Sequence, residues 1–232
     1  MARKLRILAD GGIFHVINRR VARLPLFEEA SDYQAFLKVL DQVTQIHPVR
    51  VLAFCLMPNH WHLLLWPERG KALPAFMQRL TVTHLRRWHA HRKSSGTGPV
   101  YQGRYKSFPV QDDGHLLVVA RYIERNALRA KLVKRAEQWP WCSLHERLHG
   151  TPPQWLVRPA DWPVRLRRDW LSWVNQAETA KELDAVRTSV NRGRPFGTAS
   201  WQHQTAARLK LGQSLRDPWR PRKPREPIGK GT

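Results

Sequence analysis

The sequence predicts an α+β fold, with an antiparallel sheet covered by helices on one face and a C-terminal helical and basic extension. Two observations support this class. Segments with strand and helix periodicity alternate over the first 145 or so residues, and proline and tryptophan become dense from about residue 139 onward. The chain has 232 residues, which is enough for one sizeable domain with an extension.

Strand and helix signals follow a regular order in the first part of the chain. Apolar residues spaced three and four apart indicate helices, and short apolar runs between turn residues indicate strands. The expected elements are a strand at 13–19, a helix from 31, strands at 51–57 and 60–66, a helix at 72–91, a strand at 101–110 and a helix from 112 to about 132. This order is typical of a ferredoxin-like α+β sandwich.

The later part of the chain has a different character. We expect a domain at residues 1–145, a helical extension at 146–190, and a basic C-terminal segment with a tail at 191–232. Short helices are expected at 161–176, 177–190 and 198–211, with Thr198 as the last helix's N-cap. The tail from Asp217 is rich in proline and arginine, so we expect it to be disordered.

The charge balance points to a polyanionic partner. The chain carries 40 Lys and Arg against 18 Asp and Glu, a net charge of +22. So much uncompensated charge favours nucleic acid as the partner. A membrane surface is the weaker alternative, because no separate basic amphipathic helix is evident. With no apolar run long enough to span a bilayer and no signal peptide, we expect a soluble, cytoplasmic protein without membrane contact.

Two histidines on one expected strand form a candidate metal site. Pro58 and Asn59 predict a turn, and His60, Trp61 and His62 begin the returning strand. Alternate side chains of a strand share a face, so the two imidazoles project together, about 7 Å apart at their Cα atoms. Such a pair suits metal binding. The spacing alone leaves open that they are half-buried polar residues.

The last helix of the expected domain carries a second group of polar residues. Tyr122 and Asn126 are four residues apart and therefore neighbours on one face, and Arg129 lies on the same flank. Arg121 and Arg125 form a basic edge of this helix. By itself, Tyr122 is most simply an amphipathic residue at the border of a helix.

The two groups together suggest a chemical step. A divalent cation held by His60 and His62 would leave positions for the amide oxygen of Asn126 and for phosphate oxygens. A neutral phenol is a poor nucleophile. A metal that polarises the phosphate makes attack by Tyr122 feasible and would give a covalent phosphotyrosine.

Three sequence blocks resemble one known family. Residues 57–63 (MPNHWHL), 101–107 (YQGRYKS) and 121–130 (RYIERNALRA) are similar to the single-tyrosine transposases of the HUH endonucleases, and most similar to their domesticated branch, the REP-associated tyrosine transposases. The blocks occur in the family's order, and the resemblance spans residues 13 to about 145. Residues 192–197 (RGRPFG) also resemble the C-terminal part of that branch.

The resemblance implies a ferredoxin-like HUH endonuclease domain that uses Mg²⁺ or Mn²⁺. His60, His62 and Asn126 would be the metal ligands, and Tyr122 the nucleophile that leaves a 5′-phosphotyrosine and a 3′-hydroxyl. The mobile relatives typically have glutamine where this chain has Asn126. The substrate would be single-stranded DNA beside hairpins of repetitive extragenic palindromes in a bacterial chromosome. A nucleoid-associated monomer is expected, although the mobile relatives are dimers.

Several basic residues are candidate DNA contacts. Arg is suited to phosphate because its guanidinium makes bidentate contacts. The candidates are Arg104 and Lys106 on one strand face, Arg121, Arg125 and Arg129 on the helix, and Arg192 and Arg194 in an arm that could enter a hairpin's minor groove. For Arg104 and Lys106, ordinary solvated residues remain the alternative, and for the arm with Arg192 and Arg194 a solvated linker does.

The sequence leaves open the roles of two further polar residues, and it allows two other functions. His15 could support the histidine pair or belong to the core, and Glu124 is expected to be a surface or salt-bridging residue. The main alternative to an enzyme is a non-catalytic protein that binds DNA hairpins for chromosome architecture or regulation. An RNA-binding protein is less well supported, because the strands lack the aromatic residues that stack bases in that module.

Overall fold

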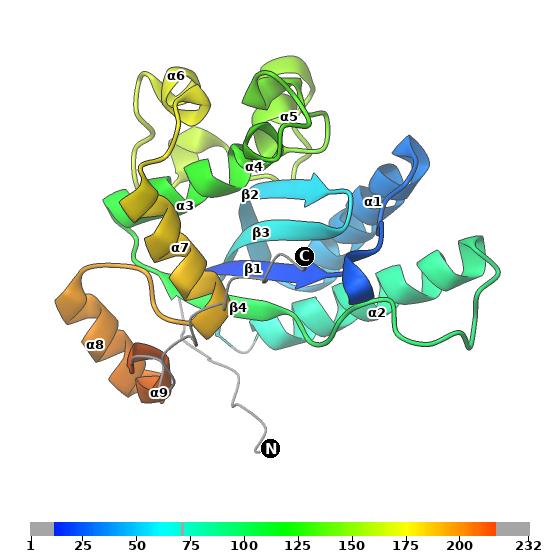
Figure 1. Cartoon of the computed structure of the whole chain (residues 1–232), viewed down its shortest axis with the longest axis horizontal. Helices are drawn as coiled ribbons and strands as arrows, with labels where there is room; N and C mark the ends of the chain where they lie inside the picture. Colours follow the sequence, from blue (N-terminus) through cyan, green and yellow to red (C-terminus); the bar gives the residue numbers. More distant parts are fainter. Residues whose placement is uncertain (1–11, 71, 217–232) are drawn as a thin grey trace, which may run out of the picture.

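A four-stranded antiparallel sheet organises the computed structural model, which describes residues 12–70 and 72–216 (Figure 1). The strands are β1 (Ile13–Arg19), β2 (Val49–Met57), β3 (His60–Pro67) and β4 (Lys106–Val110), in the spatial order β2-β3-β1-β4. Helix α1 (Ala30–Ile46) connects β1 to β2, and α2 (Ala72–His91) connects β3 to β4. The expected ferredoxin-like arrangement is therefore confirmed.

Helices cover both faces of the sheet, not one. On one face Trp61 of β3 packs in a core with Phe36 of α1 and Leu80 of α2. On the other, Leu64 of β3 packs with Ile123 of α3 (Gly114–Glu124). The expectation of helices on one face was too narrow. Strands β2 and β3 are buried along nearly their whole length, so both of their faces need a cover of apolar side chains.

Three expected elements differ from those observed. β4 begins at Lys106, and Tyr101 forms only an isolated bridge with Arg20. The last helix of the domain is interrupted at Arg125, so that α3 is followed by the short α4 (Asn126–Arg129). The helix expected over 161–176 is reduced to α6 (Trp170–Asn175).

The remaining elements are short. They are α5 (Ser143–His149), α7 (Ala180–Arg192), α8 (Ala199–Arg208), α9 (Gly212–Leu215), and the 3₁₀ turns Val21–Arg23, Ala136–Gln138 and Pro159–Asp161. Thr198 caps α8 as expected, accepting a hydrogen bond from the Trp201 amide. α5 was not anticipated. No helix within the described ranges is long and apolar enough to cross a lipid bilayer, and the tail from Asp217 lies outside those ranges.

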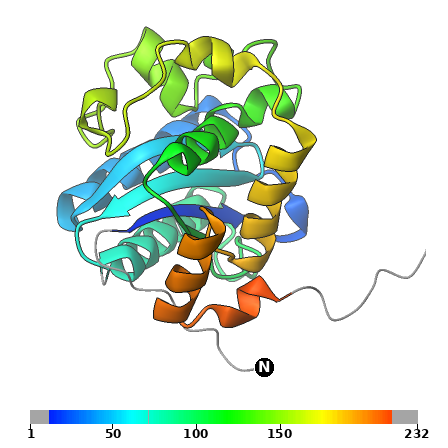
Figure 2. The same ribbon diagram turned by 90° about the vertical axis from the view of Figure 1, so that its left-hand side faces the viewer.

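The extension packs against the sheet and contacts both of its edges. Beside β2, the Val157 amide donates to the Val51 carbonyl at 2.9 Å. Beside β4, the Phe196 amide donates to the Pro109 carbonyl at 2.9 Å, and the Gln111 amide donates to the Phe196 carbonyl at 2.9 Å. Helix α7, gold in Figure 2, contacts α3 and β4. The described part of the extension therefore packs on the first domain, and the boundaries at 145 and 190 stay predictions.

A buried chain of hydrogen bonds connects β3 to α2 on the sheet face that α1 and α2 cover. The indole Nε1 of Trp61 donates to the Tyr101 hydroxyl at 3.1 Å, and that oxygen lies 2.7 Å from Nδ1 of His84 on α2. Because an indole N–H can only donate, the hydroxyl proton is free to point at His84. Burial lowers the pKa of His84 to about 3, so its imidazole is neutral and able to accept that proton.

A buried carboxylate joins α3 to the extension. Glu124 is 0 % exposed and accepts hydrogen bonds from Ser143 Oγ at 2.7 Å, Arg147 Nη1 at 2.5 Å and Trp170 Nε1 at 2.9 Å. Of the two expected roles, surface or salt-bridging, the structure shows the second, in a buried position. The partners come from 19 to 46 residues downstream, and their arrival over Glu124 has no local signal in the sequence.

Replacing Arg147 by methionine should destabilise the protein strongly. The substitution would leave the Glu124 carboxylate buried without its cation, and breaking a buried pair in this way typically costs about 3–5 kcal/mol. Chemical denaturation would measure the change in unfolding free energy. Arg158→Met is the matched control, because it removes an exposed ion pair with Asp161, and exposed pairs contribute about 0–1 kcal/mol. Equal effects of the two substitutions would contradict this assignment.

His84 should make the protein sensitive to acid. Its folded pKa of about 3 lies below its ordinary value of 6.5, so the unfolded chain binds the proton more readily. The stabilisation is complete above pH 6.5 and is lost as the pH falls toward 3.

Between pH 7 and pH 4.5, the unfolding free energy of wild type should fall by about 2–3 kcal/mol more than that of His84→Gln. Denaturant titrations at the two pH values would measure this difference. His203→Gln, which removes an exposed imidazole of α8, is the control. The same pH dependence in wild type and His84→Gln would show that His84 is not held neutral by the fold.

Candidate active site

The two histidines of β3 lie together on the sheet face that α3 covers. Their ring centroids are 5.0 Å apart. In the pairing with β1, His60 lies opposite Arg19 and His62 opposite Ile17. Trp61 is buried in the core on the other face. The period of the strand therefore placed the pair as expected.

Hydrogen bonds at Nδ1 orient both imidazole rings. Nδ1 of His60 lies 2.6 Å from the amide oxygen of Asn59. Since that oxygen accepts, Nδ1 carries the proton and Nε2 keeps its lone pair. Nδ1 of His62 lies 2.7 Å from Nε2 of His15. His15 is fully buried, so its place is in the core, directly supporting His62.

Both histidines are held in the neutral form. Burial, reinforced by the charges of Arg19 and Arg129, lowers the pKa of His60 to about 3. Burial and then the neighbouring imidazole of His15 lower the pKa of His62 well below its ordinary value. A neutral imidazole is the form that binds a metal ion.

Tyr122 lies beside the histidine pair. Its ring centroid is 5.9 Å from that of His62 and 6.3 Å from that of His15, in edge-on contacts. The guanidinium carbon of Arg129 lies 4.1 Å from the centre of the tyrosine ring. Strand β3 and helix α3 therefore bring together the two groups of residues that the sequence suggested separately.

Asn126 sits where the helix is interrupted, one turn beyond Tyr122. Its side-chain oxygen accepts a hydrogen bond from Nη2 of Arg129 at 3.0 Å, and its Nδ2 is buried without a partner in the described structure. An amide oxygen can accept at a second lone pair, so the bond to Arg129 leaves capacity for a cation.

The donor set fits a divalent cation bound partly by its substrate. In the described ranges no three His, Cys, Asp or Glu side chains gather into a metal site. The available donors are the neutral imidazoles of His60 and His62 and the amide oxygen of Asn126. Cations that prefer oxygen ligands would then fill their remaining positions with water or phosphate oxygens.

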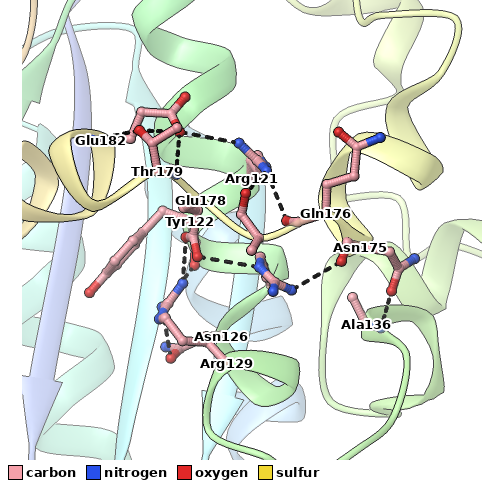
Figure 3. Close-up of polar contacts among 12 residues, drawn as sticks. Arg121, Tyr122, Asn126, Arg129, Ala136, Asn175, Gln176, Glu178, Thr179 and Glu182 are labelled. Atoms are coloured by element: carbon pink, nitrogen blue, oxygen red, sulfur yellow. Dashed lines mark hydrogen bonds and ion pairs between the residues drawn. The ribbon is translucent and has the colours of Figure 1, made fainter.

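Glu178, a carboxylate of the extension, pairs with the arginines beside Tyr122 and Asn126 (Figure 3). Glu178 lies between α6 and α7, and its side chain is almost fully buried. It pairs with Nη1 of Arg129 at 2.6 Å and with Nε of Arg125 at 3.3 Å. Arg129 also donates to the Tyr122 carbonyl at 3.1 Å. Glu178 thereby fixes the guanidinium that contacts both Tyr122 and Asn126.

Arg121 holds the same segment of the extension from the other side of the helix. It is 3 % exposed and donates to the carbonyls of Gln176 and Ala177 at 2.8 and 3.1 Å. Its guanidinium carbon lies 4.5 Å from the Trp173 ring centre. Arg121, Arg125 and Arg129 thus have partners within the protein, and their contact with DNA stays an untested prediction. Glu178 was missed, since nothing local in the sequence marks it.

The other predicted DNA contacts lie around the start of β4 and the end of α7. Arg104 and Lys106 are exposed and line one cavity together with Arg19. Arg192 ends α7, and Arg194 is partly buried, with its Nε donating to Gln202 at 3.0 Å. The structure thus brings Arg104 and Lys106 near the histidine pair, through Arg19.

Comparison with known proteins identifies the family. Residues 10–126, just over half of the chain, match the family described as "Transposase IS200 like". The chain belongs to this family. The matched range contains His60, His62, Tyr122 and Asn126, and members of the family are typically metal-dependent HUH endonucleases.

Two relatives extend this comparison. A Haemophilus influenzae protein assigned as a REP-associated tyrosine transposase is 25% identical over 141 residues, which cover 57% of this chain and 77% of the relative. The solved structure of a REP-associated tyrosine transposase bound to a REP hairpin superposes with a TM-score of 0.53 at 18% identity, covering 68% of this chain and 92% of that one. The second likeness supports the fold, including its antiparallel sheet and helices.

Replacing Glu178 by glutamine should loosen the extension from α3. The change removes the carboxylate that Arg125 and Arg129 share, and leaving such largely buried cations without a counter-charge costs at least about 1–3 kcal/mol. Thermal and denaturant unfolding would measure the loss. Asp169→Asn is the control, because it disrupts only an exposed pair with Arg167. An unfolding free energy equal to that of wild type would show that Glu178 does not secure this contact.

Proposed function

We propose that this IS200-like transposase is a metal-dependent endonuclease and strand transferase that acts on single-stranded DNA beside hairpins of repetitive extragenic palindromes. The proposal rests on one observation above all. The ring of Tyr122 lies beside His62, and His62 and His60 are both held neutral, on a chain whose family consists typically of such endonucleases.

His60 and His62, through Nε2, and Asn126, through its amide oxygen, would hold Mg²⁺ or Mn²⁺. When bound, the cation polarises the scissile phosphate and neutralises the charge that develops on it. The hydrogen bond that His60 donates to the amide oxygen of Asn59 and the one between His62 and His15 orient the two rings for this task.

Tyr122 supplies the nucleophile. Its hydroxyl oxygen forms a bond to the phosphorus while the bond from phosphorus to the 3′ oxygen breaks, and the phenol proton ends on the departing 3′ oxygen. The products are a 5′-phosphotyrosine and a free 3′-hydroxyl. Because the phosphoester is conserved, a 3′-hydroxyl can attack it in the reverse direction and rejoin a strand.

Arg129 positions the nucleophile and stabilises its charge. It lies over the Tyr122 ring and hydrogen-bonds Asn126, and Glu178 holds it in this place. A fixed cation at this distance from the ring favours the negative charge that develops on the phenol oxygen. Arg129 is therefore a positioning residue in this proposal.

The DNA partner is inferred from charge and from the related structure. The relative was solved bound to a REP hairpin, and this chain carries a net charge of +22. We propose that Arg192 and Arg194 grip the hairpin stem while the HUH domain handles the single strand. We further propose that the protein acts as a monomer and is associated with the nucleoid in the bacterial cytoplasm.

Tyr122→Phe should abolish covalent attachment to DNA. Hairpin oligonucleotides with a single-stranded flank, labelled at the 5′ or the 3′ end, are incubated with Mn²⁺ or EDTA and analysed on denaturing protein gels. Wild type should form a metal-dependent adduct that carries only the 3′ label. Loss in Tyr122→Phe and in His60→Ala, with retention in Tyr33→Phe on the opposite sheet face, would support the assigned roles.

The non-catalytic alternative predicts a different result. A hairpin-binding protein would retain affinity for the oligonucleotide yet form no adduct with any divalent cation. An adduct that persists in Tyr122→Phe would instead assign the nucleophile to another residue.

A further inference from the structure

A basic cavity opens beside the histidine pair. Its volume is about 290 Å³, and its lining includes Ile17 and Arg19 from β1, Arg104 from the segment before β4, Lys106 at the start of β4, and Asn191 from α7. The end of α7 thus forms one wall, so the cavity exists only where the extension meets the catalytic sheet.

The strand register places this cavity next to the candidate active site. Arg19 lies opposite His60 in the β1–β3 pairing. Ile17 lies opposite His62 on one side and opposite Lys106 on the other. Ile17 and Arg19 share a strand face with His15, which contacts His62. The cavity is therefore a lateral continuation of the face that carries the histidines.

The basic side chains in the cavity have no acidic ion-pair partner among the described residues. Its lining contains three cations and no carboxylate. Within the described ranges, Arg19, Arg104 and Lys106 form no ion pair, and Nε of Arg19 is buried without a hydrogen-bond partner. The arginines of α3 and α4 contrast with this, since each is paired with Glu178 or Glu182. A buried guanidinium N–H without an acceptor is costly, and an anionic oxygen in the cavity would satisfy it.

We propose that this cavity binds one nucleotide of the single strand next to the scissile phosphate. Arg19, Arg104 and Lys106 hold its phosphate, and its base and sugar lie against Ile17 and the amide of Asn191. The volume is near the lower end of the range for small-ligand pockets, about 300–1,000 Å³, which suits one nucleotide and excludes a duplex. The inference rests on the proposed function, because it names a further part of the same substrate.

The test compares two DNA probes in EDTA, where no cleavage occurs. One is a hairpin with a single-stranded flank, and the other is the same hairpin without it. Fluorescence anisotropy over a series of salt concentrations gives the affinity and its salt dependence. For the flanked probe, Lys106→Gln and Arg19→Gln should each lower the slope of log K against log salt by about 0.7, which is roughly a fourfold loss at 0.15 M salt.

The blunt hairpin should bind the variants as it binds wild type. Arg79→Gln is the matched control, because it removes an exposed arginine from α2 on the opposite face of the sheet. It should leave the affinity for both probes unchanged. If Lys106→Gln weakens the blunt and the flanked hairpin equally, the residue attracts the stem in general, and the inference is overturned.

A backbone scan locates the bound phosphate. Methylphosphonate is introduced at each linkage of the flank in turn, which removes one charge at a time. One linkage should weaken wild type about fourfold and have a smaller effect in Lys106→Gln, since the two changes act on the same contact and only Arg19 and Arg104 remain in it. Additive losses at every linkage would overturn the inference.

The outcomes separate this inference from the proposed function. A flank-dependent contact without any covalent adduct would leave the nucleotide site standing and remove the endonuclease. An adduct formed by wild type, together with no flank-dependent loss in Lys106→Gln, would leave the endonuclease standing and remove the nucleotide site.

Discussion

The guanidinium of Arg129 is the contact on which the arrangement of the site depends. It lies over the Tyr122 ring, binds the amide oxygen of Asn126 and pairs with Glu178. Tyr122 comes from α3, Asn126 from α4 and Glu178 from the extension. Because this guanidinium is largely buried, moving it to solvent would break its ion pair with Glu178, and this keeps the tyrosine and the asparagine in a fixed relation.

Contacts on both faces of the sheet also hold the two histidines in place. Trp61 anchors β3 through Tyr101 to α2 on one face, while His15 and Asn59 fix the imidazoles on the other. The backbone of a central strand leaves little freedom to either ring. The site is therefore built from a rigid sheet and a clamped helix, which is the kind of support that precise metal and nucleophile placement requires.

The sequence predicted the parts of the site that depend on local periodicity. The period of two in β3 put His60 and His62 on one face, and helical spacing put Asn126 next to Tyr122. Both sets meet in the structure. It could not predict Glu178, His15's bond to His62 or the burial of Glu124, because these depend on segments that meet only after the chain has folded. The same holds for the arginines of α3 and α4, because the sequence shows that they are charged but not which carboxylates they pair with.

For the fold, too, local sequence signals predicted the elements, whereas contacts between distant segments could not be predicted. Strand and helix signals gave β1, α2 and the order of the elements, yet they could not say that α3 would cover the second face. The continuous apolar runs of β2 and β3 did carry that information, because a strand buried on both sides needs two layers. Helix α5 was hidden in a stretch where proline and tryptophan dominate the composition.

The extension has a consequence for how the protein meets other chains. Val157 bonds to the outer side of β2, and Phe196 lies along the outer side of β4. These are the two places where an open sheet normally offers free N–H and C=O groups to a foreign strand. The chain's own later residues thus fill positions that a second molecule would need for strand exchange or fibre growth.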